Sequence, residues 1–201
     1  MKTTLREQQR LRTRAGILRV AAEEFGQRGY ASVALSDIAA RLEVTKGTVY
    51  FHFPSKAALA SAVVGTYFSA WEAVLAEVRR QNLQGIAALR WLSAQVAQSY
   101  RDEPGVRAPL RLMREADVIG IDLPTPFLPW VETVTEHLGE AQDLGEVRRG
   151  LNVEAVAWQI VAGFFGAQEI SHQLTGSADI VERVEAMWDL LLPGIEARSS
   201  A

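Results

Sequence analysis

The sequence predicts an all-α protein, and three observations support that fold class. Apolar residues recur three and four positions apart, and no segment keeps a period-two alternation between hairpin turns. A chain of 201 residues with 48% hydrophobic residues can also fill a sizeable core. The periodicity predicts about nine helices, at residues 5–28, 36–43, 46–51, 55–81, 84–101, 107–119, 126–142, 152–174 and 178–195.

Turn-forming residues separate the predicted helices. Gly29 follows the first helix, Pro54 precedes the fourth, and residues 102–105 read Asp-Glu-Pro-Gly. A proline-rich connection at 121–126 precedes the seventh helix, and two glycines bracket the loop at 145–150. The helices are therefore expected to follow one another through short connections.

The composition excludes several classes of function. The chain has no cysteine and three scattered histidines, so disulfide frameworks, cysteine-based zinc sites and thiol nucleophiles are ruled out, and neither a metal site nor a cofactor is expected. No apolar stretch follows the basic N-terminus as it would in a signal peptide, and the longest uncharged stretch, Ala57–Trp71, is too short and interrupted to span a membrane. We therefore expect a cytoplasmic protein that does not contact membranes.

Charge is distributed unevenly along the chain. The overall net charge is −3, but residues 1–60 hold ten Lys and Arg against five Asp and Glu, whereas the rest hold eleven against nineteen. A basic N-terminal part on an acidic remainder indicates that the two parts meet different partners, and that the first meets a polyanion. A chance asymmetry in a short segment is the alternative.

Residues 36–53 have the pattern of a helix-turn-helix. Ser36 can N-cap a short helix with Ile38 and Leu42 on its inner face, and Thr45 can cap a second helix with Val49 and Phe53 facing inward. The N-terminal end of the second helix would stay outward and present Thr45, Lys46, Gly47 and Thr48.

This outward end suits DNA. Backbone N–H groups, Lys46 and the hydroxyls can hold phosphates and reach base edges in the major groove, while Gly47 allows the backbone to approach closely. Tyr50 and His52 can donate to phosphates further along. The alternative is a compact three-helix module with a solvated basic face, and a helix-turn-helix pattern alone does not decide between them.

The longer pattern is more specific. It consists of Arg14-Ala15-Gly16-Ile17-Leu18, the segment from Ala22 to Tyr30, the segment from Val33 to Ala39, and the segment from Thr45 to Lys56. These residues resemble the DNA-binding head of the TetR family of bacterial transcriptional regulators, over roughly Leu11 to Leu59. The resemblance implies a helix-turn-helix DNA-binding domain at 1–53 and an effector-binding and dimerisation domain at 54–201. It also implies DNA contacts by Ser36, Thr45, Lys46, Gly47, Thr48, Tyr50, His52 and Lys56.

The last two predicted helices carry broad apolar stripes. Residues 152–174 and 178–195 each repeat the helical spacing, and small residues lie beside the first stripe. Such a pair has two faces to bury, so we expect a two-fold dimer through a four-helix bundle, as the family resemblance also implies, and therefore a palindromic operator. The alternative places both helices wholly inside a monomer.

Aromatic residues are frequent in the middle of the chain. They could line an apolar site for a small molecule, although for any single one a place in the core is the more common role. Trp130 is the exception, because it follows a stiff proline-rich entry where an indole can stack on a ligand ring. The candidates for effector binding are Trp130, Tyr67, Phe68, Trp91, Phe127, Phe164 and Phe165.

A narrower resemblance covers most of the chain. Residues 50–53, 107–113, 126–130 and 161–166 are similar to the γ-butyrolactone autoregulator receptors, TetR-type repressors that control antibiotic production and morphological development in filamentous soil bacteria. The resemblance implies that Trp130 contacts the signal molecule. Those receptors often carry a polar residue on the connecting helix and a threonine on a later one, where this chain has Tyr67 and Phe165. The ligand is therefore open between a butyrolactone, a related butenolide or furan, and an antibiotic.

Other functions remain as alternatives. A pseudo-receptor or multidrug-type repressor would keep the family and change the effector. An enzyme or carrier for a hydrophobic small molecule would use the same cavity, but no G-x-S-x-G motif, paired catalytic carboxylates or metal cluster is present in the sequence. We therefore expect a ligand-released repressor without catalytic residues.

Overall fold

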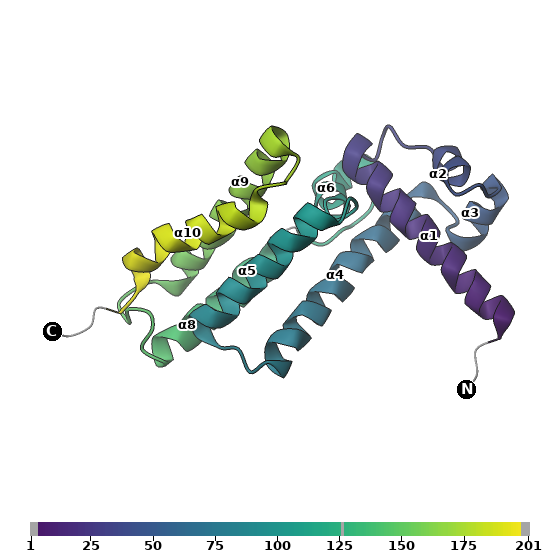
Figure 1. Cartoon of the computed structure of the whole chain (residues 1–201). Helices are drawn as coiled ribbons and strands as arrows, with labels where there is room; N and C mark the ends of the chain where they lie inside the picture. Colours follow the sequence, from purple (N-terminus) through teal and green to yellow (C-terminus); the bar gives the residue numbers. More distant parts are fainter. Residues whose placement is uncertain (1–3, 126, 198–201) are drawn as a thin grey trace. The chain divides into compact units, whose positions relative to one another are not determined.

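The computed structural model describes residues 4–125 and 127–197, which form ten helices and, apart from one isolated bridge between Val147 and Glu196, no β-structure. The all-α prediction is confirmed. In chain order (Figure 1) the helices are α1 (Leu5–Arg28), α2 (Leu35–Arg41), α3 (Lys46–His52), α4 (Lys56–Arg80), α5 (Gly85–Asp102), α6 (Ala108–Arg114), α7 (Ala116–Ile119), α8 (Leu128–Asp143), α9 (Val153–Thr175) and α10 (Ile180–Ile195).

Two helices differ from the sequence-based expectation. The helix predicted at 107–119 is interrupted at Glu115, whose backbone leaves the helical region while its carboxylate accepts a hydrogen bond from the Tyr30 backbone N–H at 2.7 Å. Ser36 does not cap α2, because α2 begins one residue earlier, at Leu35, and Asp37 Oδ2 accepts from the Ala34 backbone N–H. Pro126, the predicted start of the seventh helix, lies outside the described residues.

The chain divides into two compact units. The first unit comprises the described residues up to Ala70 together with 104–125, and the second comprises Trp71–Glu103 and the described residues from Phe127 onward. In the first unit α1, α2 and α3 surround a dry core, because their apolar residues face one another. This core contains the fully buried side chains of Ile17, Phe25, Ile38, Val49 and Leu59.

A segment distant in sequence completes the first unit. Helix α6 packs against α1, and Arg111 donates to the carbonyl oxygens of Gly26 and Gln27 at the C-terminal end of α1. The preceding turn lies so close to α1 that a Cβ on Gly105 would be 2.8 Å from the Ala22 Cβ, so a glycine is needed there. The DNA-binding fold suggested by the sequence is thus buttressed by residues 104–115.

The second unit is a bundle of α5, α8, α9 and α10 (Figure 1). Its interior includes the fully buried Leu138, Ile180 and Trp188. The Trp188 Nε1–H donates to Ser93 Oγ at 2.7 Å, which satisfies the indole inside the core and ties α10 to α5. The polar group of a large aromatic residue therefore fixes the register of two helices.

Helix α4 has the length and apolar composition that a membrane span would need, which the sequence analysis did not expect. In the described part of the chain it is the one helix that meets both criteria, and 28% of its apolar window is buried. The buried residues of α4 are Leu59, Ala60, Val63, Val64, Trp71 and Val78. Core helices of soluble proteins often share these two properties, so they are weak evidence for a membrane.

Candidate DNA-binding surface and effector pocket

The N-terminal end of α3 is built by a threonine cap. Thr45 Oγ1 accepts from the Thr48 backbone N–H at 3.1 Å and lies 2.9 Å from the Thr48 hydroxyl. The cap fixes where the helix begins, while the buried Val49 and Phe53 fix which face points inward. As a result the first turn of α3 is held outward, as predicted from the sequence.

Three predicted DNA contacts lie on this outward surface. Lys46 and Gly47 are exposed, and Tyr50 is 44% exposed, with the Lys46 ammonium 5.6 Å from its ring centre. A Cβ on Gly47 would meet only Thr45 Oγ1, at 3.6 Å, so packing among the described residues does not require a glycine there.

The other predicted contacts are placed differently. Ser36 is exposed in the first turn of α2. The Lys56 ammonium already bonds the Ala31 carbonyl oxygen and lies 4.2 Å from the Tyr30 ring centre, so it holds the loop between α1 and α2. His52 is half-buried, and its burial, together with the charges of Arg10 and Arg14, lowers its pKa. At neutral pH its imidazole is therefore uncharged and available as a neutral hydrogen-bond donor.

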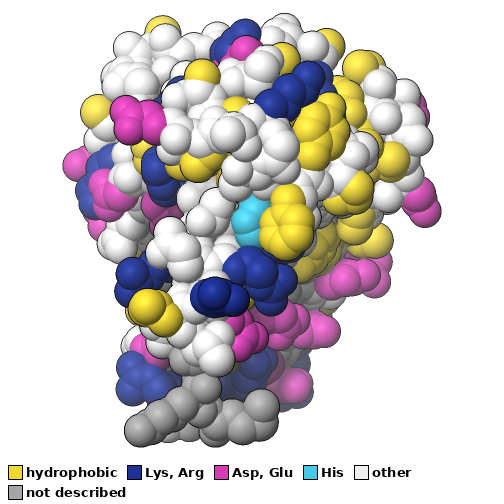
Figure 2. Space-filling view, turned by 90° about the vertical axis from the view of Figure 1, so that its right-hand side faces the viewer, with side chains coloured by type: hydrophobic (Ala, Val, Ile, Leu, Met, Phe, Trp, Pro, Cys, Tyr) yellow, Lys and Arg dark blue, Asp and Glu magenta, His cyan; other side chains and the backbone are white. Residues whose placement is uncertain are grey.

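Figure 2 shows the face on which α1 and α3 lie. Dark-blue Lys and Arg side chains stand on both sides of a cyan histidine and its hydrophobic neighbours. Phe51, the residue before His52, is 75% exposed, and its ring meets the His52 ring edge-on at 5.2 Å. The surface thus combines positive charge with exposed aromatic groups, a combination that suits a nucleic acid.

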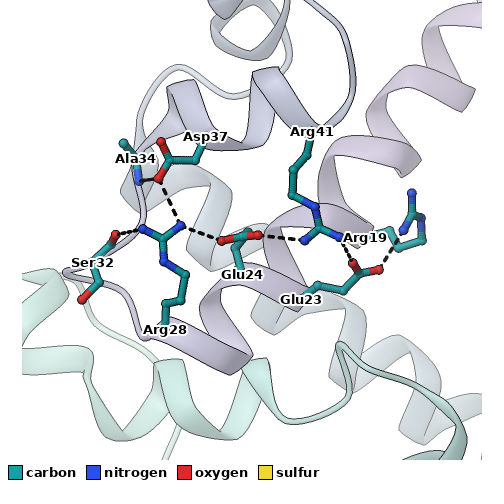
Figure 3. Close-up of polar contacts among 8 residues, drawn as sticks. All are labelled: Arg19, Glu23, Glu24, Arg28, Ser32, Ala34, Asp37 and Arg41. Carbon is teal, nitrogen blue, oxygen red and sulfur yellow. Dashed lines mark hydrogen bonds and ion pairs between the residues drawn. The ribbon is translucent and has the colours of Figure 1, made fainter.

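A network of charged side chains fixes α2, and with it α3, against α1 (Figure 3). Glu24 accepts from Arg28 on its own helix and from Arg41 on α2, each at 2.8 Å. Arg41 also donates to Glu23 at 2.7 Å. Arg28 donates in addition to Asp37 and to the Ser32 carbonyl oxygen. The carboxylates of Glu23 and Glu24 are buried, so the network neutralises charge that the core could not otherwise hold.

The network makes a prediction about stability. The Arg28 hydrogen bond, assisted by Arg41, holds the pKa of Glu24 below its usual value, so the ionised form favours the folded state. Glu24→Gln should lower the free energy of unfolding at pH 7 by about 1.5–3 kcal/mol, measured by urea titration. This difference should shrink as the pH falls below about 4.3, where the unfolded glutamate takes up a proton. Glu7→Gln, at an exposed site on the same helix, is the control and should change little.

The second unit contains a small apolar cavity with a volume of about 20 Å³. This is room for about one water molecule, far below the roughly 300 Å³ of a typical small-molecule site. A molecule larger than water could enter only if the lining side chains moved. The cavity is lined by Trp71, Leu89, Leu92, Ser93, Trp130, Thr133, Val134, Ile160, Val161, Phe164 and Phe165.

Trp130 is the centre of an aromatic cluster at this cavity. Its ring lies 4.1 Å from that of Trp71, is stacked on Phe164 at 5.9 Å and meets Phe165 edge-on at 5.7 Å. Aromatic rings therefore surround the indole, and Trp130 is only 6% exposed.

The sequence analysis identified only some of the residues that line the cavity. Trp130, Phe164 and Phe165 line it, and Phe127 contacts Phe165 at 4.7 Å between ring centres. Trp91 is half-buried on α5 and does not line it. Tyr67 and Phe68 contact each other at 5.1 Å and belong to the first unit. Their assignment to effector binding stays a prediction.

The lining residues that the sequence analysis did not identify include a further aromatic residue and the polar groups of the cavity. Trp71 completes the aromatic cluster, and Ser93 and Thr133 contribute hydroxyls. Ser93 is occupied by Trp188 and the Arg90 carbonyl oxygen, whereas Thr133, 8% exposed, has no hydrogen-bond partner among the described residues. The spacing of three residues between Trp130 and Thr133 was the available signal, because it puts both on one helical face.

Helices α9 and α10 leave an open groove on the second unit, with a volume of about 630 Å³. Ile170, Leu174 and Leu190 line it and are 61%, 77% and 81% exposed. Trp158 on α9 is also 60% exposed. Large apolar side chains gathered in this way are uncommon on a monomer and mark an interaction surface.

The comparison with known proteins identifies the family. The sequence profile described as bacterial regulatory proteins, tetR family, matches residues 17–63, and the profile of the tetracyclin repressor-like C-terminal domain matches residues 84–196. The chain belongs to the TetR family. The family predicted from residues 14–56 is thereby confirmed, and the region matched by the first profile contains α2 and α3 with their threonine cap.

Individual relatives confirm the narrower resemblance. The A-factor receptor protein of Streptomyces griseus is 34% identical over 185 residues, which are 92% of this chain and 64% of that protein. A structure of an ArpA-like γ-butyrolactone receptor has a TM-score of 0.80 at 31% identity, covering 94% of this chain and 90% of that one. A second structure, solved to explain control of antibiotic production by bacterial hormones, has a TM-score of 0.82 at 38% identity and covers 93% of this chain and 99% of that one.

A fourth relative has been solved with DNA. The TetR family protein CprB from Streptomyces coelicolor, in complex with its biological operator, has a TM-score of 0.81 at 30% identity and covers 94% of this chain and 90% of that one. These homologues are transcriptional regulators, and TetR regulators bind operator DNA.

Proposed function

We propose that the protein is a cytoplasmic, dimeric repressor that binds a palindromic operator and is released by a small hydrophobic signal such as a γ-butyrolactone. The observation that carries the proposal is the first turn of α3, where the Thr45 cap holds Lys46 and Gly47 outward with no structural use among the described residues. In this turn the Lys46 ammonium, the threonine hydroxyls and the backbone N–H groups can reach phosphates and base edges, and Gly47 leaves room for close approach. Ser36, Tyr50, His52 and Lys56 add contacts around it.

Dimerisation would use α9 and α10. Their exposed leucines and isoleucine need a partner, and a second copy of the same groove offers a self-complementary one. Two copies then present two α3 helices to successive major grooves, which accounts for a two-fold operator.

Release would be a population shift. The closed cavity can hold only about one water, so an effector selects a conformation in which the aromatic cluster has opened. If that conformation spaces the two α3 helices wrongly for the operator, a differential affinity of about 150-fold would supply roughly 3 kcal/mol against DNA binding. The lining carries no ionisable side chain, which favours a neutral ligand and requires neither a cofactor nor catalysis.

The test is a gel-shift titration with DNA from just upstream of the protein's own coding region, at two salt concentrations and with a lipophilic extract of the culture. A salt-sensitive shift that the extract abolishes supports the proposal. A shift that the extract leaves intact would favour the pseudo-receptor or multidrug-type repressor, for which the apolar Phe165 in the pocket wall is the motivating observation. Turnover of a candidate ligand without DNA binding would instead indicate an enzyme.

Lys46→Ala is the variant that tests the DNA contact. Loss of one phosphate contact should reduce the salt slope of log K by about 0.9 per protomer, or about eightfold in affinity per protomer at 0.1 M salt, measured by fluorescence anisotropy. Arg149→Ala removes the same charge from an exposed site on the second unit and serves as the control. Equal affinities for the two variants would contradict the assignment of Lys46.

A further inference from the structure

The first turns of α1 carry a basic segment that the fold does not use. Helix α1 begins at Leu5, twelve residues before the region that the family profile matches, and every residue from 5 to 12 is exposed. This segment contains Arg6, Arg10 and Arg12, with Arg14 following. Packing within the described chain therefore does not account for four arginines in nine residues.

The Lys and Arg side chains of α1, α2 and α3 fall into two groups. Arg19, Arg28 and Arg41 are each paired with a carboxylate of the network in Figure 3. Among the described residues, no carboxylate pairs with the four arginines at 6–14 or with Lys46 on α3. Within these three helices, the positive charges without a carboxylate partner therefore lie at the start of α1 and the start of α3.

Three of the four arginines form one stripe. Arg6, Arg10 and Arg14 are four residues apart, which places them on one side of the helix at intervals of about 6 Å, while Arg12 points to the opposite side. The Arg14 guanidinium lies 4.9 Å from the ring centre of Phe53, the residue that ends α3. The stripe therefore comes close to the C-terminal end of α3 at Arg14. Lys46 lies at the opposite, N-terminal end of α3.

Two further observations place the stripe on the surface that α3 presents. Burial, and after it the nearby charges of Arg10 and Arg14, lower the pKa of His52, which agrees with both guanidinium groups lying in its neighbourhood. On the same face, Figure 2 shows basic side chains on both sides of a histidine and its aromatic neighbours. The stripe and the exposed end of α3 therefore belong to the same face, with Arg14 in contact with Phe53.

We propose that Arg6, Arg10 and Arg14 form a second DNA-binding surface, which holds backbone phosphates next to the groove that α3 enters. The proposal rests on the DNA binding proposed above and adds to it a surface outside the helix-turn-helix. Guanidinium groups bind phosphate oxygens through paired N–H donors, and roughly half or more of protein–DNA hydrogen bonds go to phosphate and sugar. The stripe contributes affinity without reading sequence, and it extends the protein's contact along the duplex.

The test compares Arg10→Gln with Arg12→Gln, which removes the same charge from the opposite side of the same helix. Anisotropy titrations over about 50–200 mM salt use two labelled duplexes, the fragment upstream of the coding region and a scrambled one of equal length. Arg10→Gln should reduce the slope of log K against log salt concentration by about 0.9 per protomer on both duplexes. The double variant, which carries both Arg6→Gln and Arg10→Gln, should reduce it by about twice that amount. Arg12→Gln should leave it unchanged, and Arg10→Lys should restore it. Arg14 is left intact because it also contacts Phe53.

The outcomes separate the two proposals. If Arg10→Gln and Arg12→Gln give the same slope while Lys46→Ala lowers it, the second surface is refuted and the DNA-binding helix stands. If the unsubstituted protein binds neither duplex, both proposals fall together. A loss with Arg10→Gln on the operator fragment alone would mean that the arginine reads bases, which also overturns a phosphate-binding stripe. Equal melting curves for all variants exclude unfolding as the cause.

Discussion

Leu174→Glu is expected to convert the protein into a monomer and to weaken its affinity for the operator by about 10²- to 10⁴-fold. Leu174 is 77% exposed in the groove between α9 and α10, where Ile170 and Leu190 offer further apolar surface. A carboxylate buried there against a second copy would lie among apolar side chains, and the groove's Arg183 is already paired with Asp179, so the dimer would lose stability. A monomer holds one half-site only, and the gain from simultaneous binding of two half-sites disappears. Sedimentation velocity and anisotropy titration measure the two effects.

The control for this prediction is Leu144→Glu. Leu144 is also exposed, at 55%, and it belongs to the second unit but lies at the end of α8 and does not line the groove. It should leave both the sedimentation coefficient and the DNA affinity unchanged. If the Leu174→Glu protein remained dimeric, this result would contradict the assignment of α9 to the dimer interface.

Trp130→Ala is expected to lower the free energy of unfolding by about 3–5 kcal/mol, the usual range for deletion of a buried aromatic side chain. Trp130 is 6% exposed and packs on Trp71, Phe164 and Phe165, so the change leaves a cavity among three aromatic rings. Urea titration measures the loss. Trp130→Phe, which keeps an aromatic ring, should lose much less stability and still respond weakly to the culture extract.

Thr133→Val separates ligand recognition from stability. The substitution keeps the shape of the side chain and removes a hydroxyl that has no partner among the described residues, so the free energy of unfolding should stay the same or rise. If the hydroxyl bonds the effector, about tenfold more extract should be needed to release DNA, which corresponds to about 1.4 kcal/mol. Unchanged release with unchanged stability would assign Thr133 to packing alone.

The parts of this molecule that depend on neighbouring residues were predictable from the sequence. Thr45 caps the helix it precedes, and Val49 and Phe53 are buried because their spacing puts them on one side of α3. Features set by distant residues were not predictable. The break at Glu115 depends on Tyr30, which is 85 residues away. The Ser36 cap failed because Asp37, one position later, satisfies the backbone instead.

At the effector pocket, too, features set by neighbouring residues were predictable and features set by distant residues were not. Trp130 was identified from the local proline-rich entry, whereas Trp71 reaches it from a different helix and gave no separate signal. Other aromatic residues that the sequence pattern did not distinguish from these, such as Trp91, do not line the cavity. Composition can indicate that an apolar site exists, but only the packing of several helices selects the side chains that form it.

The division of the chain into two units has a consequence for how an effector could act. The main chain passes from one unit to the other three times, at 70/71, 103/104 and 126/127. Two of these junctions begin the second unit with an aromatic residue at the pocket: Trp71, which lines it against Trp130, and Phe127, which contacts Phe165. On the proposed mechanism, an effector that displaces Trp71 or Phe165 acts next to two separate peptide connections. We therefore expect that loosening α4 alone attenuates release from DNA rather than abolishing it.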